Sequence, residues 1–442
     1  KFSPFFMQLP VHPQIYNLFI GIFPHVVLLG AIPCCLYQLQ TVFVEGFLFR
    51  CVNTFVLACI LYVFTQKSMR MHHSDKGIKK VTQWPSSELL EPKMKIGDPL
   101  MDTLLEKSFE MGVKRPIQYT NRKSYEHIAH LPEFRELQKR LQTVPSWVDH
   151  DRIQKAYSFY RDNITLIFAG MATGLIESYT YPNDAKVLEI NGGLTGIKGT
   201  MARLNRTVQF VHDVVSNKRI PEFGTDTFNR IVNIRFIHAF ARKYCKDSPD
   251  WNEDFTPINQ FAQAGTLIFF CQTPIELVKQ RGIAVSPEEA ECAWQLWRYV
   301  GYLMGVEEEL LPETYEHGLL LKYHPIVTTR QNTNETSAKL AETTIEALSQ
   351  DIRVPFHKPI FRAQLKLYVG DDVYKALNLP MPTWFDMRHF DVMNFWCSHV
   401  RFCDYWSSFL RKWKNFFFYR YFIAAGVIKA HKPEPKRQNS FY

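Results

Sequence analysis

The chain has 442 residues, of which 46% are hydrophobic, so it can form one large domain or two to three smaller ones with a substantial core. Its formal net charge is +9, but Lys and Arg are scattered or lie beside very apolar segments. No nucleic-acid-binding motif is visible, so we expect no nucleic acid partner and read the charge as facing a membrane. There are nine Cys, an odd number, and none forms a C-x-x-C pair, so we expect neither a disulfide framework nor a zinc site. This pattern fits a reducing compartment.

The N-terminal segment is very apolar. Residues 18–39 contain no Asp, Glu, Lys or Arg, and about 20 apolar residues span a bilayer as a helix. A second apolar run, residues 47–64, predicts either a short span or a helix in the interface. The basic stretch at 67–80 would stay cytosolic by the positive-inside rule. We therefore expect residues 1–66 to anchor the chain in a lipid bilayer with a cytosolic catalytic domain; the alternative is a buried hairpin of a soluble protein.

The rest of the chain has helical periodicity. Residues 67–144 are polar and rich in Pro, which favours a juxtamembrane region with short helices at Pro99–Glu110 and Glu133–Thr143. From Pro145 onward no sustained period-two alternation occurs, so residues 145–380 are predicted to form one large all-α domain. The expected helices there are Asp149–Gly170, Gly193–Asn217, Thr225–Tyr244, Pro257–Thr273, Ser286–Gly305 and Ala338–Gln350.

The C-terminal tail, residues 381–442, is dense in aromatic side chains interleaved with Lys and Arg. This composition suits an interfacial helix on anionic lipid. An aromatic-rich core helix is the alternative.

His238 is the most distinctive residue of the helical region. It lies in the segment T-D-T-F-N-R-I-V-N-I-R-F-I-H-A-F-A-R-K-Y-C at 225–245, for which Thr225 or Asp226 is a plausible N-cap. Its helix face is otherwise apolar. Arg235 and Arg242 flank it at one helical turn. Imidazole is a good axial ligand for haem iron, and Arg suits the haem propionates. The structural alternative is a hydrogen-bonded core His with ordinary ion pairs at the edge.

A second pair of polar residues lies on the preceding helix. Arg203 and Thr207 are four residues apart on a stripe that Val211 and Val214 continue. A cation and a hydroxyl on an apolar stripe can serve a propionate or order water near bound oxygen. The alternative is a solvent-edge Arg and a Thr bonded to its own helix. His212 and Asp213 lie off this stripe and are expected at the surface.

Several segments, in this order, resemble one family. They are P-S-W-V-D at 145–149, E-S-Y-T-Y-P-N-D-A-K-V-L at 177–188, R-L-N-R-T-V-Q-F-V at 203–211, R-F-I-H-A-F-A-R at 235–242, T-P-I-N-Q at 256–260, A-G-T-L-I-F-F at 264–270 and W-R-Y-V-G-Y-L-M-G-V at 297–306. Together they resemble the latex clearing protein (rubber oxygenase) family and the ER-bound oxygenase of mycophenolic acid biosynthesis in the same superfamily. The resemblance covers roughly residues 145–320.

The resemblance implies an all-α fold, haem b as cofactor and an oxygenase activity. It makes His238 the iron ligand and Arg203 with Thr207 the pair important for activity. Arg235 and Arg242 would then bind the propionates. The family's distal Lys has no matching motif here; Lys107, Lys114 and Lys123 are its candidates by position, and Glu177 and Glu189 are candidate active-site carboxylates.

Three functions follow as hypotheses. The first is a membrane-bound, haem-dependent oxygenase of the endoplasmic reticulum that uses O₂, with or without an electron donor, on an apolar, isoprenoid-like substrate. Whether it is a dioxygenase or a monooxygenase stays open. The second is a catalytically inactive, membrane-tethered lipid-binding or scaffold protein with the same fold. The third, a non-haem metal enzyme, lacks a second ligand at helical spacing from His238.

Overall fold

The computed structural model describes residues 86–390, with breaks at 193–195, 217–219, 252–253, 281–283, 325–332, 351–357 and 389. The chain divides into two compact units, Lys1–Met69 and Arg70–Tyr442, and all described residues belong to the second. The expected spans at 18–39 and 47–64, and residues 391–442 of the tail, lie outside the described residues. Among the helices that are described, none combines the length and the apolar character needed to cross a bilayer.

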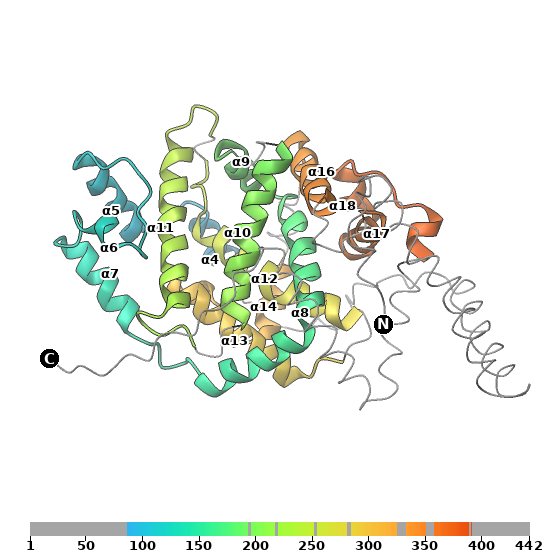
Figure 1. The fold of residues 1–442 in the computed structure, drawn as a ribbon, viewed down its shortest axis with the longest axis horizontal. Coiled ribbons are helices and arrows are strands. Elements are labelled where there is room, and N and C mark those ends of the chain that lie inside the picture. The colour runs from blue at the N-terminus through green and yellow to red at the C-terminus, as the bar shows by residue number, and fades with distance from the viewer. Residues whose placement is uncertain are drawn as a thin grey trace, which may run out of the picture. The chain divides into compact units, whose positions relative to one another are not determined.

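The described part of the chain is all-helical and contains no strand, as the periodicity predicted (Figure 1). Its helices are α4 (Ser87–Lys93), α5 (Pro99–Glu110), α6 (Arg122–Tyr125), α7 (Pro132–Gln142), α8 (His150–Ser178), α9 (Pro182–Ile190), α10 (Gly196–Ser216), α11 (Asp226–Lys246), α12 (Gln260–Gln280), α13 (Pro287–Leu303), the 3₁₀ turn η3 (Glu308–Leu310), α14 (Tyr315–Lys322), α16 (Glu335–Gln350), α17 (Lys358–Val369) and α18 (Asp371–Ala376).

Local sequence signals explain where several helices begin. Thr225 caps α11, because its side chain accepts a hydrogen bond from the backbone N–H of Phe228. Ser286 and Glu289 form a reciprocal capping box at the start of α13. Each motif satisfies backbone donors that the first helical turn leaves without partners. The predicted N-terminus of α11 is thereby confirmed.

Helix α8 continues for eight residues beyond the predicted end at Gly170. Here glycine serves close packing instead of helix termination. A Cβ on Gly170 would lie 2.5 Å from Cα of Pro274, and one on Gly174 would lie 3.0 Å from the carbonyl oxygen of Phe269. The two glycines, one turn apart, therefore let α8 and α12 approach closely along their lengths.

Helix α8 occupies the centre of the hydrophobic core and packs against α10, α12 and α13. From α13, the fully buried Trp297 donates its indole N–H to the Tyr160 hydroxyl of α8 at 2.9 Å. Residues 86–142, assigned from sequence to a juxtamembrane region, join the same core through side chains such as Leu104 and Phe134.

Two ion pairs, each made by a buried Arg, fasten α11 to α5. The Arg235 guanidinium binds both carboxylate oxygens of Asp98, at 2.6 and 3.1 Å. The Arg242 Nε lies 2.8 Å from Asp102. The two Asp are one turn apart on α5 and its N-cap, and the two Arg are two turns apart on α11. We call this set the arginine clasp.

Glycine makes room for the clasp. Gly305 has φ +85°, and a Cβ there would lie 2.5 Å from Cζ of Arg235. A Cβ on Gly97 would lie 2.7 Å from Cδ of Arg242. The Gln260 amide donates to the carbonyl oxygens of both glycines, at 2.7 and 3.0 Å. The clasp thus joins three chain segments that are far apart in sequence.

Breaking one half of the clasp should destabilise the fold. Arg235→Met leaves the Asp98 carboxylate buried without its cation, which we expect to lower the free energy of unfolding by about 3–5 kcal/mol. The double variant Asp98→Asn/Arg235→Met removes that charge while Asn keeps the N-cap of α5, so it should recover part of the loss. Urea denaturation measures both. Equal loss in the two variants would contradict an uncompensated charge as the cause.

Candidate functional site

His238 is mostly buried near the middle of α11. Burial, aided by the nearby Arg242 charge, lowers its pKa to about 4, while the Gln263 side chain acts in the opposite direction through a hydrogen bond. The imidazole is therefore neutral at neutral pH, which is the state that binds a metal ion. Its Nδ1 atom is buried without a hydrogen-bond partner among the described residues.

The two arginines beside His238 are already engaged by the protein. We expected Arg235 and Arg242 to bind haem propionates. All three guanidinium nitrogens of Arg235 instead contact Asp98 or the Leu303 carbonyl oxygen. Arg242 binds Asp102 and the Ile258 carbonyl oxygen, which leaves only Nη2 without a partner in the described structure. In the described structure Asp98 occupies the Arg235 guanidinium, and binding of a propionate by Arg235 stays a prediction.

Arg203 is partly buried, and its guanidinium makes a contact inside the fold. Its Nη2 donates to the Tyr179 hydroxyl at 3.0 Å, and that hydroxyl contacts the Thr344 hydroxyl at 3.2 Å. Arg203 Nη1 and the Thr200 hydroxyl, one turn before it, are buried and have no partner among the described residues. Buried polar groups in proteins are nearly always paired. This pair of groups on α10 therefore suits a bound anionic group.

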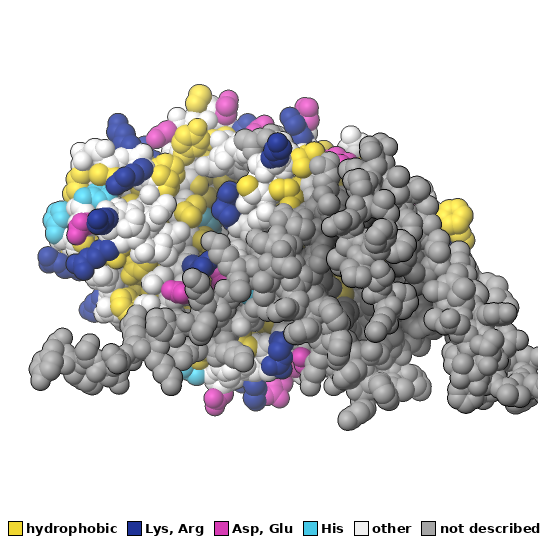
Figure 2. Space-filling model, in the orientation of Figure 1, with side chains coloured by type: hydrophobic (Ala, Val, Ile, Leu, Met, Phe, Trp, Pro, Cys, Tyr) yellow, Lys and Arg dark blue, Asp and Glu magenta, His cyan; other side chains and the backbone are white. Residues whose placement is uncertain are grey.

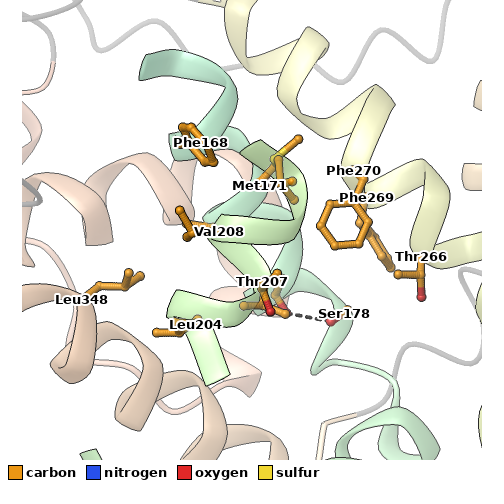
Figure 3. A pocket seen from close by; sticks show the side chains of 13 residues that line it. Phe168, Met171, Ser178, Leu204, Thr207, Val208, Thr266, Phe269, Phe270 and Leu348 are labelled. Carbon is orange, nitrogen blue, oxygen red and sulfur yellow. Dashed lines mark hydrogen bonds between the residues drawn. The ribbon is translucent and has the colours of Figure 1, made fainter. Parts of the chain in front are cut away.

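Thr207 lines an open, apolar pocket (Figure 3). Helices α8, α10 and α12 form the pocket, with side chains such as Met171, Val208 and Phe269. The Thr207 hydroxyl donates to the carbonyl oxygen of Arg203 at 3.2 Å, so its proton stays within the helix. A pocket with this lining accommodates a hydrocarbon.

One face of α12 connects His238 with the pocket. Gln263 contacts His238, while Thr266 and Phe270, three and seven residues later, line the pocket. Residues at these spacings share one face of a helix. Sequence periodicity predicts that these residues of α12 share a face, but not that the face lies against His238 of α11. Gln263 was therefore not among the predicted site residues.

The remaining candidates fall into different places. His212 is buried, with 4% of its surface exposed, so the expectation that it lies at the surface is wrong. The neighbouring residues Val211, Val214 and Val215 of α10 are buried too, so this turn of the helix faces the core. Lys114 and Lys123 are exposed over α5–α7, where Figure 2 shows Lys and Arg side chains. Lys107 pairs with Glu133, and Glu189 pairs with Lys186.

No group of three or more His, Cys, Asp or Glu that could hold a metal ion occurs in the described residues. Glu177 lies in the electrostatic surroundings of the buried Lys322.

Comparison with known proteins identifies the class. The family model described as "ER-bound oxygenase mpaB/B'/Rubber oxygenase, catalytic domain" matches residues 157–399, more than half of the chain, and the chain belongs to this family. It is 22% identical over 226 residues to the rubber oxygenase of Streptomyces sp. (strain K30). That match covers 50% of this chain and 54% of the relative, so the chain spans about half the length of the curated relative.

The fold is similar to that of a solved structure, latex clearing protein in the closed state. The TM-score is 0.57 at 17% identity, and the match covers 72% of this chain and 90% of the other. The resemblance predicted from the sequence motifs is confirmed, and so is the all-α fold.

Acid should destabilise the protein through His238. Between its ordinary pKa of 6.5 and its folded-state pKa of about 4, only the unfolded chain takes up the proton. The free energy of unfolding should therefore fall as the pH drops through this window, by about 3 kcal/mol in total. His238→Asn should remove that contribution. Denaturation of both proteins without bound cofactor at pH 7, 5.5 and 4.5 measures the difference, and parallel pH curves would contradict a buried neutral imidazole.

Proposed function

We propose that this protein is a haem-dependent oxygenase that uses O₂ to attack an apolar, isoprenoid-like substrate. The observation that carries the proposal is the neutral, mostly buried His238 next to the α12 face that lines the apolar pocket. Membership of an oxygenase family, and the likeness to a relative named rubber oxygenase, support the reaction class and the substrate class.

The residues present fit a haem. His238 supplies a neutral imidazole, and its Nδ1 has no hydrogen-bond partner among the described residues. An axial ligand needs one such free ring nitrogen. Arg203 Nη1, the Thr200 hydroxyl and Arg242 Nη2 are buried and unpaired among the described residues, and they suit propionate oxygens. When bound, the haem would supply an iron centre that binds and activates O₂.

The chain's own residues have distinct roles in this proposal. The arginine clasp orients α11 and so fixes the direction of the His238 ring, because both arginines lie within one turn of it. The Tyr179 hydroxyl, which also contacts Thr344, accepts a hydrogen bond from Nη2 of Arg203. Nη1 of Arg203 is left for an anion. The pocket side chains exclude water and bind the substrate through apolar contact.

The alternative is a lipid-binding or scaffold protein that keeps the pocket without the chemistry. The pocket alone fits both. Consumption of O₂ in the presence of an apolar alkene, with and without a reductant, separates them and also tests for an electron donor. A bilayer partner and a location at the endoplasmic reticulum remain predictions that rest on the sequence of residues 1–66.

The cofactor is tested by absorption spectroscopy of protein expressed with ample haem supply. Wild-type protein should show a Soret band, and His238→Ala should lose it while keeping its helicity, because a helix tolerates Ala. His212→Ala is the matched control: it removes another buried His of the same domain, and it should keep the band. A colourless but folded wild type, or a native Soret band in His238→Ala, would overturn the proposal.

A further inference from the structure

The pocket contains three hydroxyl groups, and each donates its proton to its own helix. Ser178 donates to the Leu175 carbonyl oxygen at 2.7 Å, and Thr266 to that of Ala262 at 2.8 Å. Thr207 donates in the same way to α10. None of these hydroxyls offers a donor to a bound molecule, so shape and apolar area, not polar recognition, decide what the pocket accepts.

The two ends of the pocket differ. Thr266 is exposed, whereas Leu204 and Leu348 are 5% and 7% exposed. In Figure 3 these two leucines lie at one side of the pocket and Thr266 at the other, with Thr207 between them. A chain that enters beside Thr266 therefore meets the two leucines at the inner end.

Leu348 differs from the rest of the lining in its origin. Among the described residues that line the pocket, it alone comes from outside α8, α10 and α12. Its helix, α16, packs against α10, and the contact between Thr344 and Tyr179 ties it to the end of α8. Thr344 lies one turn before Leu348 and is fully buried, so the side chain of Leu348 is held in place.

We propose that Leu348 is a specificity-determining residue that sets the longest hydrocarbon chain the pocket accepts. This inference rests on the proposed function, because it takes the pocket as the substrate site. It makes α16 the end wall of that site and chain length the property on which substrates are discriminated.

Calorimetric binding of 1-alkanols from C6 to C14 to the whole purified chain tests the inference. Affinity should rise about fourfold with each methylene until the chain end reaches Leu348, and then level off. Leu348→Ala removes an isopropyl group from the end wall and should move the plateau to chains longer by roughly two carbons. Leu348→Phe should move it to shorter chains.

Leu340→Ala is the matched control, because Leu340 is buried in the same helix but does not line the pocket. It should leave the plateau where it is in the wild type. An unchanged plateau in both Leu348 variants, or an equal shift in the control, would overturn the inference. The Soret absorbance of the same samples separates the two proposals. A shifted plateau in colourless protein would support the role of Leu348 and contradict the proposal that the protein binds haem.

Discussion

The structure depends on the arginine clasp, the ion pairs of Arg235 with Asp98 and of Arg242 with Asp102. Each Arg is buried, and an unpaired charge at either position would be costly, so α11 has one favourable register against α5. His238 lies between the two arginines on α11. Because the clasp fixes α11 against a segment far away in sequence, it also fixes the position of the His238 imidazole. The proposal that His238 binds a metal ion requires such a fixed position of the ring.

The second constraint is the close packing of α8 on α12 through Gly170 and Gly174. It places the apolar face of α12 next to that of α8, and the pocket lies along both with α10 as the third wall. The Arg203 guanidinium binds Tyr179, and the Thr207 hydroxyl of the pocket bonds to its own helix. The unpaired polar groups of Arg203 and Thr200 are therefore distinct from the apolar lining of the pocket within one domain.

Much of this architecture follows from the sequence. Helix α5 has the predicted bounds, Pro99–Glu110, and the Thr225 cap begins α11 as expected. The partners of the site were not predictable, because Asp98 lies 137 residues from Arg235 and a single sequence carries no signal that pairs them. Helix α9 was missed for a local reason. It has nine residues and no side-chain cap, which is too short for the helical period to stand out.

The central claim is that His238 binds the haem iron, and chemical rescue tests it most directly. His238→Gly removes the imidazole and leaves a space of its shape, at a cost in helix stability of about 1 kcal/mol. Magnetic circular dichroism should show no histidine-ligated haem in this variant. We predict that haem added together with imidazole restores the wild-type spectrum, and that haem with 2-methylimidazole, which crowds the iron, restores less. A variant whose spectrum is native without imidazole, or does not respond to it, would contradict the assignment.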